Sequence, residues 1–296
     1  MVERAEAVVA PAVSVIIPCY NGGAFLPAVL RSLAAQTFRD FEIIIVDDGS
    51  TDAATGELLA SLEPNVDVIR QDNRGLAAAR NTGFAAARGD FVLPLDCDDT
   101  LDPTFLAATY AALRAAPSDV GFVGTNMRLT GALEAVVERR FDRFAQLFRN
   151  QLSYCMLFRK SAWRAVGGYN EAMREGYEDW EFNVHLIAMG FRGINIEQPL
   201  FNYYVSGQGM LMSRSGRMHA TLWRRIREQH PELYRWSWLR THHDKQNLVR
   251  RFLRLASAVV VLAGARIIPE SIMNRLHYVW LLAKKRGLIP WHVPIN

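Results

Sequence analysis

The chain has 296 residues, of which 50% are hydrophobic and 22% are charged, and its formal net charge is +4. This length and apolar content supply a large core, which excludes an intrinsically disordered protein. The three cysteines, Cys19, Cys97 and Cys155, lie far apart without a CxxC spacing, which argues against a disulfide framework and a cysteine-based zinc site. We therefore expect reduced thiols in a cytoplasmic protein.

The charge is distributed unevenly along the chain. Residues 1–213 hold 18 Lys+Arg against 26 Asp+Glu, whereas residues 214–296 hold 16 against 4. We predict a domain over 1–213, followed by a basic, tryptophan-rich helical region over 214–296. The N-terminal residues lack the basic segment and apolar run of a secretion signal. The longest apolar run, 255–265, is shorter than the roughly 18 residues that a membrane-spanning helix needs.

Apolar runs alternate with helical patterns in the first hundred residues. Four β-branched runs are too apolar to leave a face in water and predict buried strands: 13–18, 41–47, 66–69 and 91–96. Between the first two runs, Phe25, Leu26, Val29, Leu30 and Leu33 recur at the spacing of one buried helix face. Further helices are predicted over 76–87 and 103–116. This alternation predicts an α/β fold, with a Rossmann-like, mainly parallel sheet covered on both sides by helices.

The order is less regular after about residue 125. Strands are predicted over 120–124 and 153–158, and the segment SAWRAVGGYN reads as a short helix that ends in a glycine turn. A helix over 177–190 opens with acidic residues and stops at Gly190. From Ser215 onward the pattern is helical and rich in arginine and tryptophan.

Polar residues follow each of the first four predicted strands. These loops read PCYNGG, DDGSTD, QDNRG and DCDD. Because ligands bind at the carboxyl ends of parallel strands, we expect the four loops to meet at one edge of the sheet and to form a binding site there.

An acidic cluster, Asp96, Asp98 and Asp99, follows the fourth predicted strand. Each repulsion in a partly buried site costs on the order of 1–4 kcal/mol, so a positive charge is expected among them. Asp96 and Asp98 are hard oxygen ligands that suit Mg²⁺ or Mn²⁺ bridging to a diphosphate. For Asp102, which precedes Pro103, the expected role is a helix cap.

Three blocks of sequence carry a family resemblance: VSVIIPCYNGGAFLPAVLRSLAAQTFRDFEIIIVDDGSTD, NRGLAAARNTGFAAARGDFVLPLDCDD and GGYNEAMREGYEDWEFNVHLIAMG. In this order and spacing they resemble the inverting family 2 glycosyltransferases of GT-A fold, over about residues 12–205. The resemblance implies transfer of a sugar from a nucleotide-diphosphate donor to a saccharide or lipid-linked acceptor, with Mn²⁺ or Mg²⁺ as cofactor. The QxxRW element of processive synthases is absent, so we expect non-processive addition.

The resemblance also assigns roles to individual residues. It places these residues at the nucleotide: Pro18, Tyr20, Asn21, Asp48, Arg80 and Asp96. Asp98, together with Asp96, would hold the metal ion. Asp179 would take the proton of the acceptor hydroxyl, with Glu178 orienting the acceptor or holding nearby backbone.

Each assignment has a structural alternative. Asp48 could form a turn in DDGS, Tyr20 could pack in the core, and Arg80 could lie on a solvated helix face. Asp179 and Glu178 could simply favour the dipole of their helix. Trp180 could stack on an acceptor sugar or pack in the core.

Two other functions are alternatives to glycosyl transfer. A sugar nucleotidyltransferase would usually carry a basic, glycine-rich phosphate loop after its first strand, and PCYNGGAFLP has no basic residue. A non-catalytic saccharide- or nucleotide-binding module would keep the acids without turnover.

The basic C-terminal region combines arginines with five tryptophans: Trp223, Trp236, Trp238, Trp280 and Trp291. This composition predicts contact with an anionic membrane surface, at the inner face of the membrane where lipid-linked acceptors lie. An ordinary helical subdomain packed on the sheet is the alternative. No nucleic-acid partner is expected, because the arginines match no recognised motif.

Overall fold

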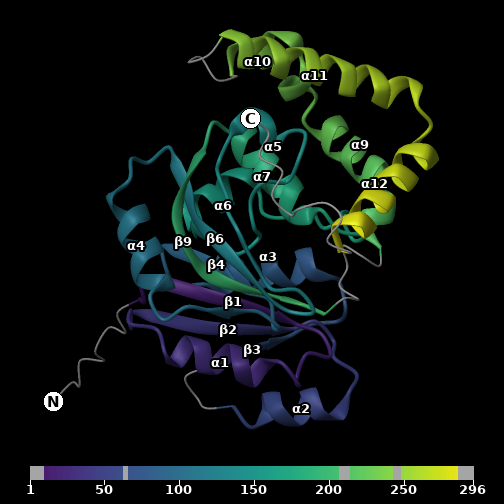
Figure 1. Ribbon diagram of the computed structural model, residues 1–296. Helices are drawn as coiled ribbons and strands as arrows, with labels where there is room; N and C mark the ends of the chain where they lie inside the picture. The colour runs from purple at the N-terminus through teal and green to yellow at the C-terminus, as the bar shows by residue number, and fades with distance from the viewer. Residues whose placement is uncertain (1–9, 63–65, 207–213, 243–247, 286–296) are drawn as a thin grey trace, which may run out of the picture.

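The computed structural model describes residues 10–62, 66–206, 214–242 and 248–285 (Figure 1). Four parallel strands form its first half, in the spatial order β3-β2-β1-β4. Their bounds are Val13–Cys19 for β1, Phe41–Asp47 for β2, Val66–Arg70 for β3 and Phe91–Pro94 for β4. Every residue of β1 is buried, as expected for a central strand covered on both faces.

Helices cover both faces of this sheet. One face packs on α1 (Leu26–Ala34), α2 (Ala53–Ala60) and α4 (Phe105–Ala115). The other face packs on α3 (Leu76–Ala86), α6 (Lys160–Val166) and α7 (Glu178–Ala188). The predicted α/β fold is therefore confirmed, and the predicted helix over 103–116 begins two residues later than expected, at Phe105.

The second half of the sheet is mixed. Its strands are β5 (Thr100–Leu101), β6 (Val120–Gly131), β7 (Ala135–Val137), β8 (Leu157–Arg159) and β9 (Arg192–Val205), and α5 (Arg143–Gln146) precedes β8. β8 pairs antiparallel with β4 and β6. β6 also pairs parallel with β9, and β9 pairs antiparallel with β5 at the end of the strand order. The long strand β9 was not predicted, because its sequence RGINIEQPLFNYYV lacks a sustained apolar alternation and its pairing with β6 contains register shifts.

The C-terminal region is helical, as predicted. It comprises two short 3₁₀ helices, η1 (Ser215–Met218) and η2 (Pro231–Tyr234), and the α-helices α9 (His219–Gln229), α10 (Trp236–Thr241), α11 (Leu248–Ile267) and α12 (Glu270–Lys285). In Figure 1 these helices, green to yellow, lie on the side of α5 and α7 and away from α1 and α2. In the part of the chain that the structure describes, no helix has the length and apolar content to cross a membrane.

A third apolar cluster joins these helices to the α/β part. It combines Trp180 and Val184 of α7 with Leu222, Trp223 and Ile226 of α9. The proposed division between 213 and 214 stays a prediction: residue 213 lies outside the described residues, and the basic helices share this core with α7. Trp291 also lies outside the described residues.

Gly83 sets how closely α3 approaches the sheet. A Cβ atom at this position would lie 2.4 Å from Cγ2 of Ile16 in β1 and 3.2 Å from Cγ2 of Val46 in β2. We expect Gly83→Ala to lower the free energy of unfolding by about 1–3 kcal/mol, because the added methyl group overpacks the interface. Urea denaturation measures this difference.

Gly56, within α2, is the matched control, because a Cβ atom there would meet nothing within 4 Å. Gly56→Ala should raise the free energy of unfolding by about 0.5–1 kcal/mol through helix propensity. Equal effects of the two substitutions would contradict the close approach of α3 to β1.

Candidate functional site

Arg80 of α3 joins two acidic residues that lie far apart in the sequence. Its guanidinium donates to Oδ1 of Asp96, which follows β4, and to Oε1 of Glu178, the first residue of α7, each at 2.8 Å. The Arg80 side chain is 1% exposed and stands over the rings of Tyr154 and Tyr169, at 4.8 and 5.4 Å. Arg80 therefore does not belong to a solvated helix face, and it supplies a positive charge that the acidic cluster requires.

The electrostatics follow from this burial. Burial alone would lower the pKa of Arg80, but Asp96 and Glu178 raise it above its usual value, so the guanidinium stays charged. Burial raises the pKa of Glu178 to about 7 against the opposing effect of Arg80. One arginine thus shares its charge between two carboxyl groups on different elements.

Asp99 is buried and both of its carboxylate oxygens accept hydrogen bonds within the fold. Its Oδ2 accepts from the Tyr154 hydroxyl at 2.5 Å and its Oδ1 from the Tyr204 backbone N–H at 2.7 Å. The Tyr154 hydroxyl also accepts from the backbone N–H of Asp96 at 3.0 Å. Burial, followed by the charges of Asp96 and Asp98, raises the pKa of Asp99 well above its usual value. Asp99 therefore ties the acidic loop to β9.

Asp102 was expected to be the N-cap of α4 because it precedes Pro103, but this expectation is wrong. Its Oδ1 accepts from the backbone N–H and the hydroxyl of Thr104, at 3.1 and 2.8 Å, and Thr104 occupies the cap position. The prediction placed the helix start at Pro103, whereas the chain makes one further turn before Phe105.

Asp98 and Asp96 are the acids of this loop that keep some exposure. Burial, with the nearby charge of Asp96, raises the pKa of Asp98 to about 6. Asp96 is 25% exposed at its side chain, and one of its oxygens binds Arg80. The two carboxyl groups thus present oxygen ligands at alternate positions beyond β4, on the edge where the sequence predicted them.

Asp48 holds the loop before α3. Its Oδ1 accepts from Gln71 Nε2 at 2.7 Å and from the Arg74 backbone N–H at 2.9 Å, and its Oδ2 accepts from the Gly75 N–H at 2.8 Å. The turn in DDGS instead belongs to Asp47, whose Oδ1 accepts from the Ser50 N–H at 2.8 Å. The alternative of a turn in DDGS is therefore wrong for Asp48.

The loop after β1 contains Asn21, which bonds to a neighbouring loop, and Tyr20, whose side chain is exposed. Asn21 adopts φ +52° and its Oδ1 accepts from the backbone N–H groups of Thr51 and Asp52, at 2.8 and 3.2 Å, so it joins two of the predicted loops. Tyr20 is 49% exposed and does not pack in the core. Pro18 lies in β1 and pairs with Val46 of β2.

Asp179 lies at the start of α7, next to Glu178. Its Oδ2 accepts from Asn150 Nδ2 at 2.9 Å and its Oδ1 from the Trp180 N–H at 2.7 Å. Burial raises the pKa of Asp179, and Arg80 opposes this shift. Trp180 is 2% exposed and its Nε1 donates to the Gln146 carbonyl, so it belongs to the core and cannot stack on a sugar.

The backbone at Tyr177 orients these two acids. Tyr177 has φ +64°, a left-handed conformation that costs a bulky residue on the order of 1–3 kcal/mol. Its hydroxyl contacts Nδ1 of His219 at 2.9 Å, and its ring lies 5.2 Å from that of Trp180. These contacts from α9 and the core hold the turn that places Glu178 on Arg80.

Sequence reasoning missed Tyr154, Asn150 and Tyr177. The first two lie in the irregular segment between α5 and β8, which has no periodic pattern and whose predicted strand forms only at Leu157–Arg159. The pair Gly176-Tyr177 before an acidic helix start was the one available signal, since glycine often precedes a sharp turn.

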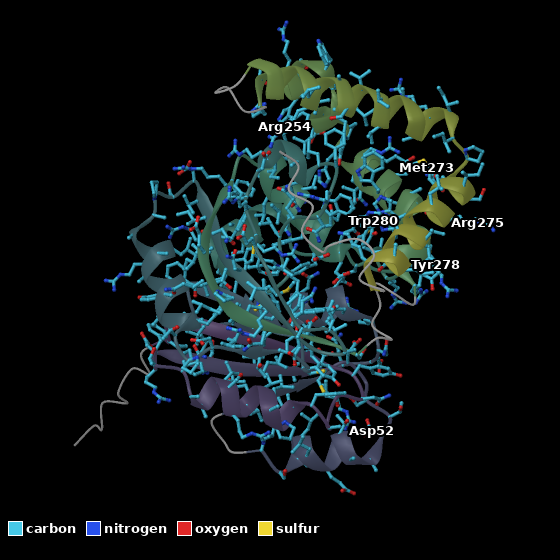
Figure 2. All side chains as sticks on the ribbon, viewed as in Figure 1. Asp52, Arg254, Met273, Arg275, Tyr278 and Trp280 are labelled. Carbon is cyan, nitrogen blue, oxygen red and sulfur yellow. The ribbon has the colours of Figure 1, made fainter. Side chains whose placement is uncertain are left out.

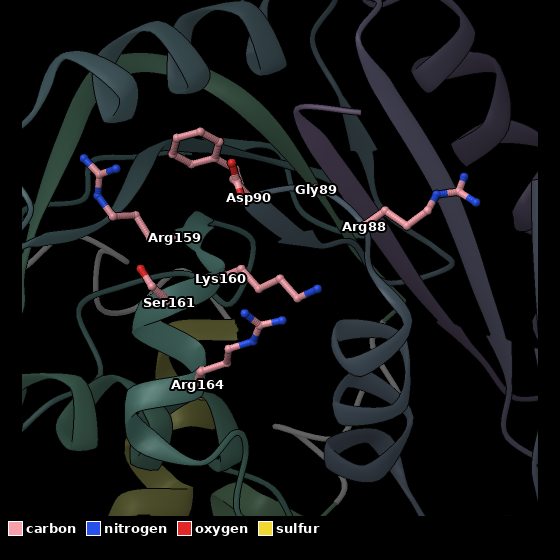
Figure 3. A pocket seen from close by; sticks show the side chains of 8 residues that line it. Arg88, Gly89, Asp90, Arg159, Lys160, Ser161 and Arg164 are labelled. Atoms are coloured by element: carbon pink, nitrogen blue, oxygen red, sulfur yellow. The ribbon is translucent and has the colours of Figure 1, made fainter. Parts of the chain in front are cut away.

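A cavity of about 350 Å³ lies at the amino end of β4, away from the acidic loop (Figure 3). Its lining includes Arg88, Arg159, Lys160 and Arg164, and the first three of these cations serve the fold. Arg88 pairs with Glu42 at 2.6 Å, Arg159 donates to three backbone carbonyls, and Lys160 donates to the Ala87 carbonyl. This cavity is therefore not a candidate for the substrate site.

A Rossmann-like sheet extended by mixed strands, with acidic loops at its carboxyl edge, is the architecture of the GT-A fold. Solved structures share this fold. S. aureus TarS 1-349 in complex with UDP-GlcNAc matches with a TM-score of 0.64 and 18% identity, over 96% of this chain and 94% of that one. The mannosyltransferase PcManGT from Pyrobaculum calidifontis, in complex with GDP-Man and Mn²⁺, matches with a TM-score of 0.55 and 18% identity, over 95% and 84%.

The glycosyl transferase family 2 model matches residues 14–197, and the chain belongs to this family. The chain is 34% identical over 191 residues to a PGL/p-HBAD biosynthesis glycosyltransferase of Mycobacterium bovis, and this match covers 60% of this chain and 71% of that protein. The chain is 43% identical over 97 residues to the putative glycosyltransferase EpsH of Bacillus subtilis, and this match covers 32% of this chain and 28% of EpsH. The family that the three sequence blocks predicted is therefore confirmed.

We expect Arg80→Met to lower the free energy of unfolding by about 3–5 kcal/mol, because it leaves the buried Glu178 and the partly buried Asp96 without their cation. Chemical denaturation at pH 7 measures the loss. Adding Glu178→Gln to Arg80→Met should recover part of it, because one uncompensated charge is then removed.

Arg192→Met is the matched control. Arg192 pairs with Asp119 at 2.6 Å, but both side chains are about half exposed, so the loss should stay below about 1 kcal/mol. If Arg80→Met proved as mild as Arg192→Met, Arg80 would not hold the site together.

Proposed function

We propose that this glycosyltransferase catalyses metal-dependent, inverting transfer of a hexosyl group from a nucleotide-diphosphate sugar to a saccharide or lipid-linked acceptor, without processivity, in polysaccharide or glycoconjugate biosynthesis. One observation carries the proposal. The buried Arg80 joins Asp96, on the loop expected to face the donor, to Glu178, the neighbour of the expected base Asp179. Donor-side and acceptor-side acids thus belong to one site.

The donor side fits a nucleotide. Tyr20 exposes a ring on which a base can stack. Oδ2 of Asp48 accepts one hydrogen bond from the chain and has capacity for another, from a ring N–H of the base. The neighbours TarS and PcManGT were solved with UDP-GlcNAc and GDP-Man, which supports a nucleotide sugar as the donor class.

The carboxylate oxygens of Asp96 and Asp98 fit a divalent cation. Asp98 would be the principal ligand and Asp96 the second, because Arg80 already engages one oxygen of Asp96. Carboxylate oxygens are the ligands that Mg²⁺ and Mn²⁺ prefer, and PcManGT was solved with Mn²⁺. When bound, such an ion supplies Lewis-acid stabilisation of the diphosphate leaving group.

Asp179 fits the role of general base. Asn150 and the Trp180 N–H hold its carboxylate in place, and its raised pKa lies closer to neutral pH than that of an ordinary aspartate. As the acceptor oxygen bonds to the anomeric carbon and the bond to the diphosphate breaks, this carboxylate takes the hydroxyl proton. Glu178 is engaged by Arg80 and therefore acts as a positioning residue.

Cations on the acceptor side favour an acceptor that carries a phosphate. Arg139 donates to the Gln151 carbonyl at 3.2 Å, next to Asn150; burial lowers the pKa of Arg139 to about 10, against the opposing effect of the Asp179 charge. Burial, with the charges of Arg149 and Arg139, lowers the pKa of Lys284 to about 8. The phosphate of a lipid-linked acceptor would add a favourable charge interaction with these cations.

The C-terminal helices carry an exposed apolar surface. Its most exposed side chains are Leu253, Val260, Ile267, Leu276 and Val279. Figure 2 shows Arg275 projecting from the outer side of α12. We place this surface at the inner face of the membrane, where apolar groups enter the headgroup boundary and the net positive charge of residues 214–296 meets anionic lipid. The enzyme is then cytoplasmic and peripheral.

Asp179→Asn should lower turnover by roughly 10²–10⁴-fold, because the amide cannot take the proton. The Kd for the nucleotide diphosphate should stay within about threefold, since Asp179 lies on the acceptor side. A screen of nucleotide sugars, followed by release of the nucleotide diphosphate with Mn²⁺ and with Mg²⁺, measures turnover, and calorimetry measures binding.

Asp98→Asn is the matched variant, because the same change of chemistry on the donor side should weaken metal-dependent nucleotide binding. Full turnover in Asp179→Asn would refute the role of Asp179 as general base. Undiminished activity after chelation would refute metal dependence. Absence of turnover with every donor would instead support a non-catalytic binding module.

Val260→Asp with Leu276→Asp should reduce flotation with anionic phospholipid vesicles by about fivefold or more, since carboxylates are repelled by anionic headgroups and do not enter the acyl region. Both positions are more than 60% exposed, so the fold should survive. Val68→Asp with Val136→Asp adds the same charge to exposed positions of the sheet and should float like the parent protein. Equal recovery of both double variants would refute the membrane surface.

A further inference from the structure

A second cluster of ligating side chains lies further along α7 and outside the donor site. It comprises Glu181 and His185 of α7 and His230, which follows α9. The candidate ligand atoms of the three side chains all lie within 4.8 Å of one another. Nε2 of His230 and Oε1 of Glu181 are 2.8 Å apart, and the two imidazole centroids are 4.9 Å apart.

The cluster opens on a cavity of about 480 Å³. The lining of this cavity includes all three side chains, the Gly167–Gly168 turn, Asn170 and Glu232. Glu181 is 3% exposed and His230 is 5% exposed, while His185 is partly buried. A buried carboxylate needs a positive or hydrogen-bonding partner, and here the groups facing it are two imidazoles beside a space large enough for an ion and its water.

We propose that Glu181, His185 and His230 bind a Zn²⁺ ion, with a fourth position open to a water molecule in the cavity. Two nitrogen ligands and one carboxylate oxygen match the ligand set of zinc and disfavour Mg²⁺ and Mn²⁺. Glu181 and His185 are four residues apart and share a face of α7, so only His230 must come from elsewhere in the fold.

The required movements are small. Zinc–ligand distances of about 2.0–2.2 Å in a tetrahedral site separate neighbouring ligand atoms by about 3.3–3.6 Å. The Glu181–His230 pair at 2.8 Å therefore opens by about 0.5–0.8 Å as the ion replaces the shared proton, and the widest pair closes by up to about 1.5 Å.

This ion would join α7 to the segment after α9. The same helix starts with Glu178 and Asp179, so the bound ion would fix the helix that carries the acids of the active site. Its role would be structural, separate from the cation at Asp98, and the inference does not depend on which donor or acceptor the enzyme uses.

Calorimetric titration of chelator-treated full-length protein with Zn²⁺, in saturating Mg²⁺ to occupy the donor-site carboxylates, tests the proposal. We expect one Zn²⁺ per chain and a higher thermal midpoint on binding. His185→Gln and His230→Gln should each weaken Zn²⁺ binding by about 100-fold or more, because loss of a direct ligand exceeds the 10–100-fold effect of outer-shell changes. His230→Gln keeps a donor for Glu181, and His185→Gln changes a partly buried residue, so both should fold.

His242→Gln removes an exposed histidine of the same region and should bind like the parent protein. Asp98→Asn should also keep the zinc site. The proposal is overturned if Zn²⁺ neither binds at one per chain nor shifts the midpoint. It is equally overturned if binding survives His185→Gln but is lost in Asp98→Asn; Glu181 and His230 would then form only a hydrogen bond.

Discussion

The structure depends on one buried guanidinium. Taking a cation out of water costs several kcal/mol, and this cost is offset only where carboxylates and hydrogen bonds surround it closely. Arg80 meets this condition with Asp96, Glu178 and two tyrosine rings. Because Asp96 follows β4 and Glu178 begins α7, the same interaction that satisfies the charge also fixes α7 against the loop after β4.

The helix α7 distributes its acids among different partners. Glu178 meets Arg80, Asp179 meets Asn150, and Glu181 meets His230. Three acids in the first turn favour the helix dipole, as the sequence indicated. In the fold, however, each also acts as a tie to another element, so the orientation of α7 is determined at several points along its length.

The C-terminal helices extend the enzyme beyond the part that the family model covers, residues 14–197. They share a core with α7 through Trp223 and Ile226, and His219 contacts Tyr177 at the turn before Glu178. A basic region that sequence composition separates from the catalytic part is thus in direct contact with it. Through this contact, the C-terminal helices support the turn that places Glu178 and Asp179.

The sequence by itself determined the strands β1 to β4, the helices α1 and α3 and the acidic edge, because burial of β-branched runs and helical periodicity are local signals. The spacing of Asp96 and Asp98, and the family resemblance for Asp179 and Glu178, marked these four acids as candidate site residues. Only the tertiary structure decided that Arg80 is buried between Asp96 and Glu178, that β9 forms, and that Asn150, Tyr154 and His230 face the acids. These contacts join residues tens of positions apart, and their partners depend on how whole elements pack, which no local pattern records.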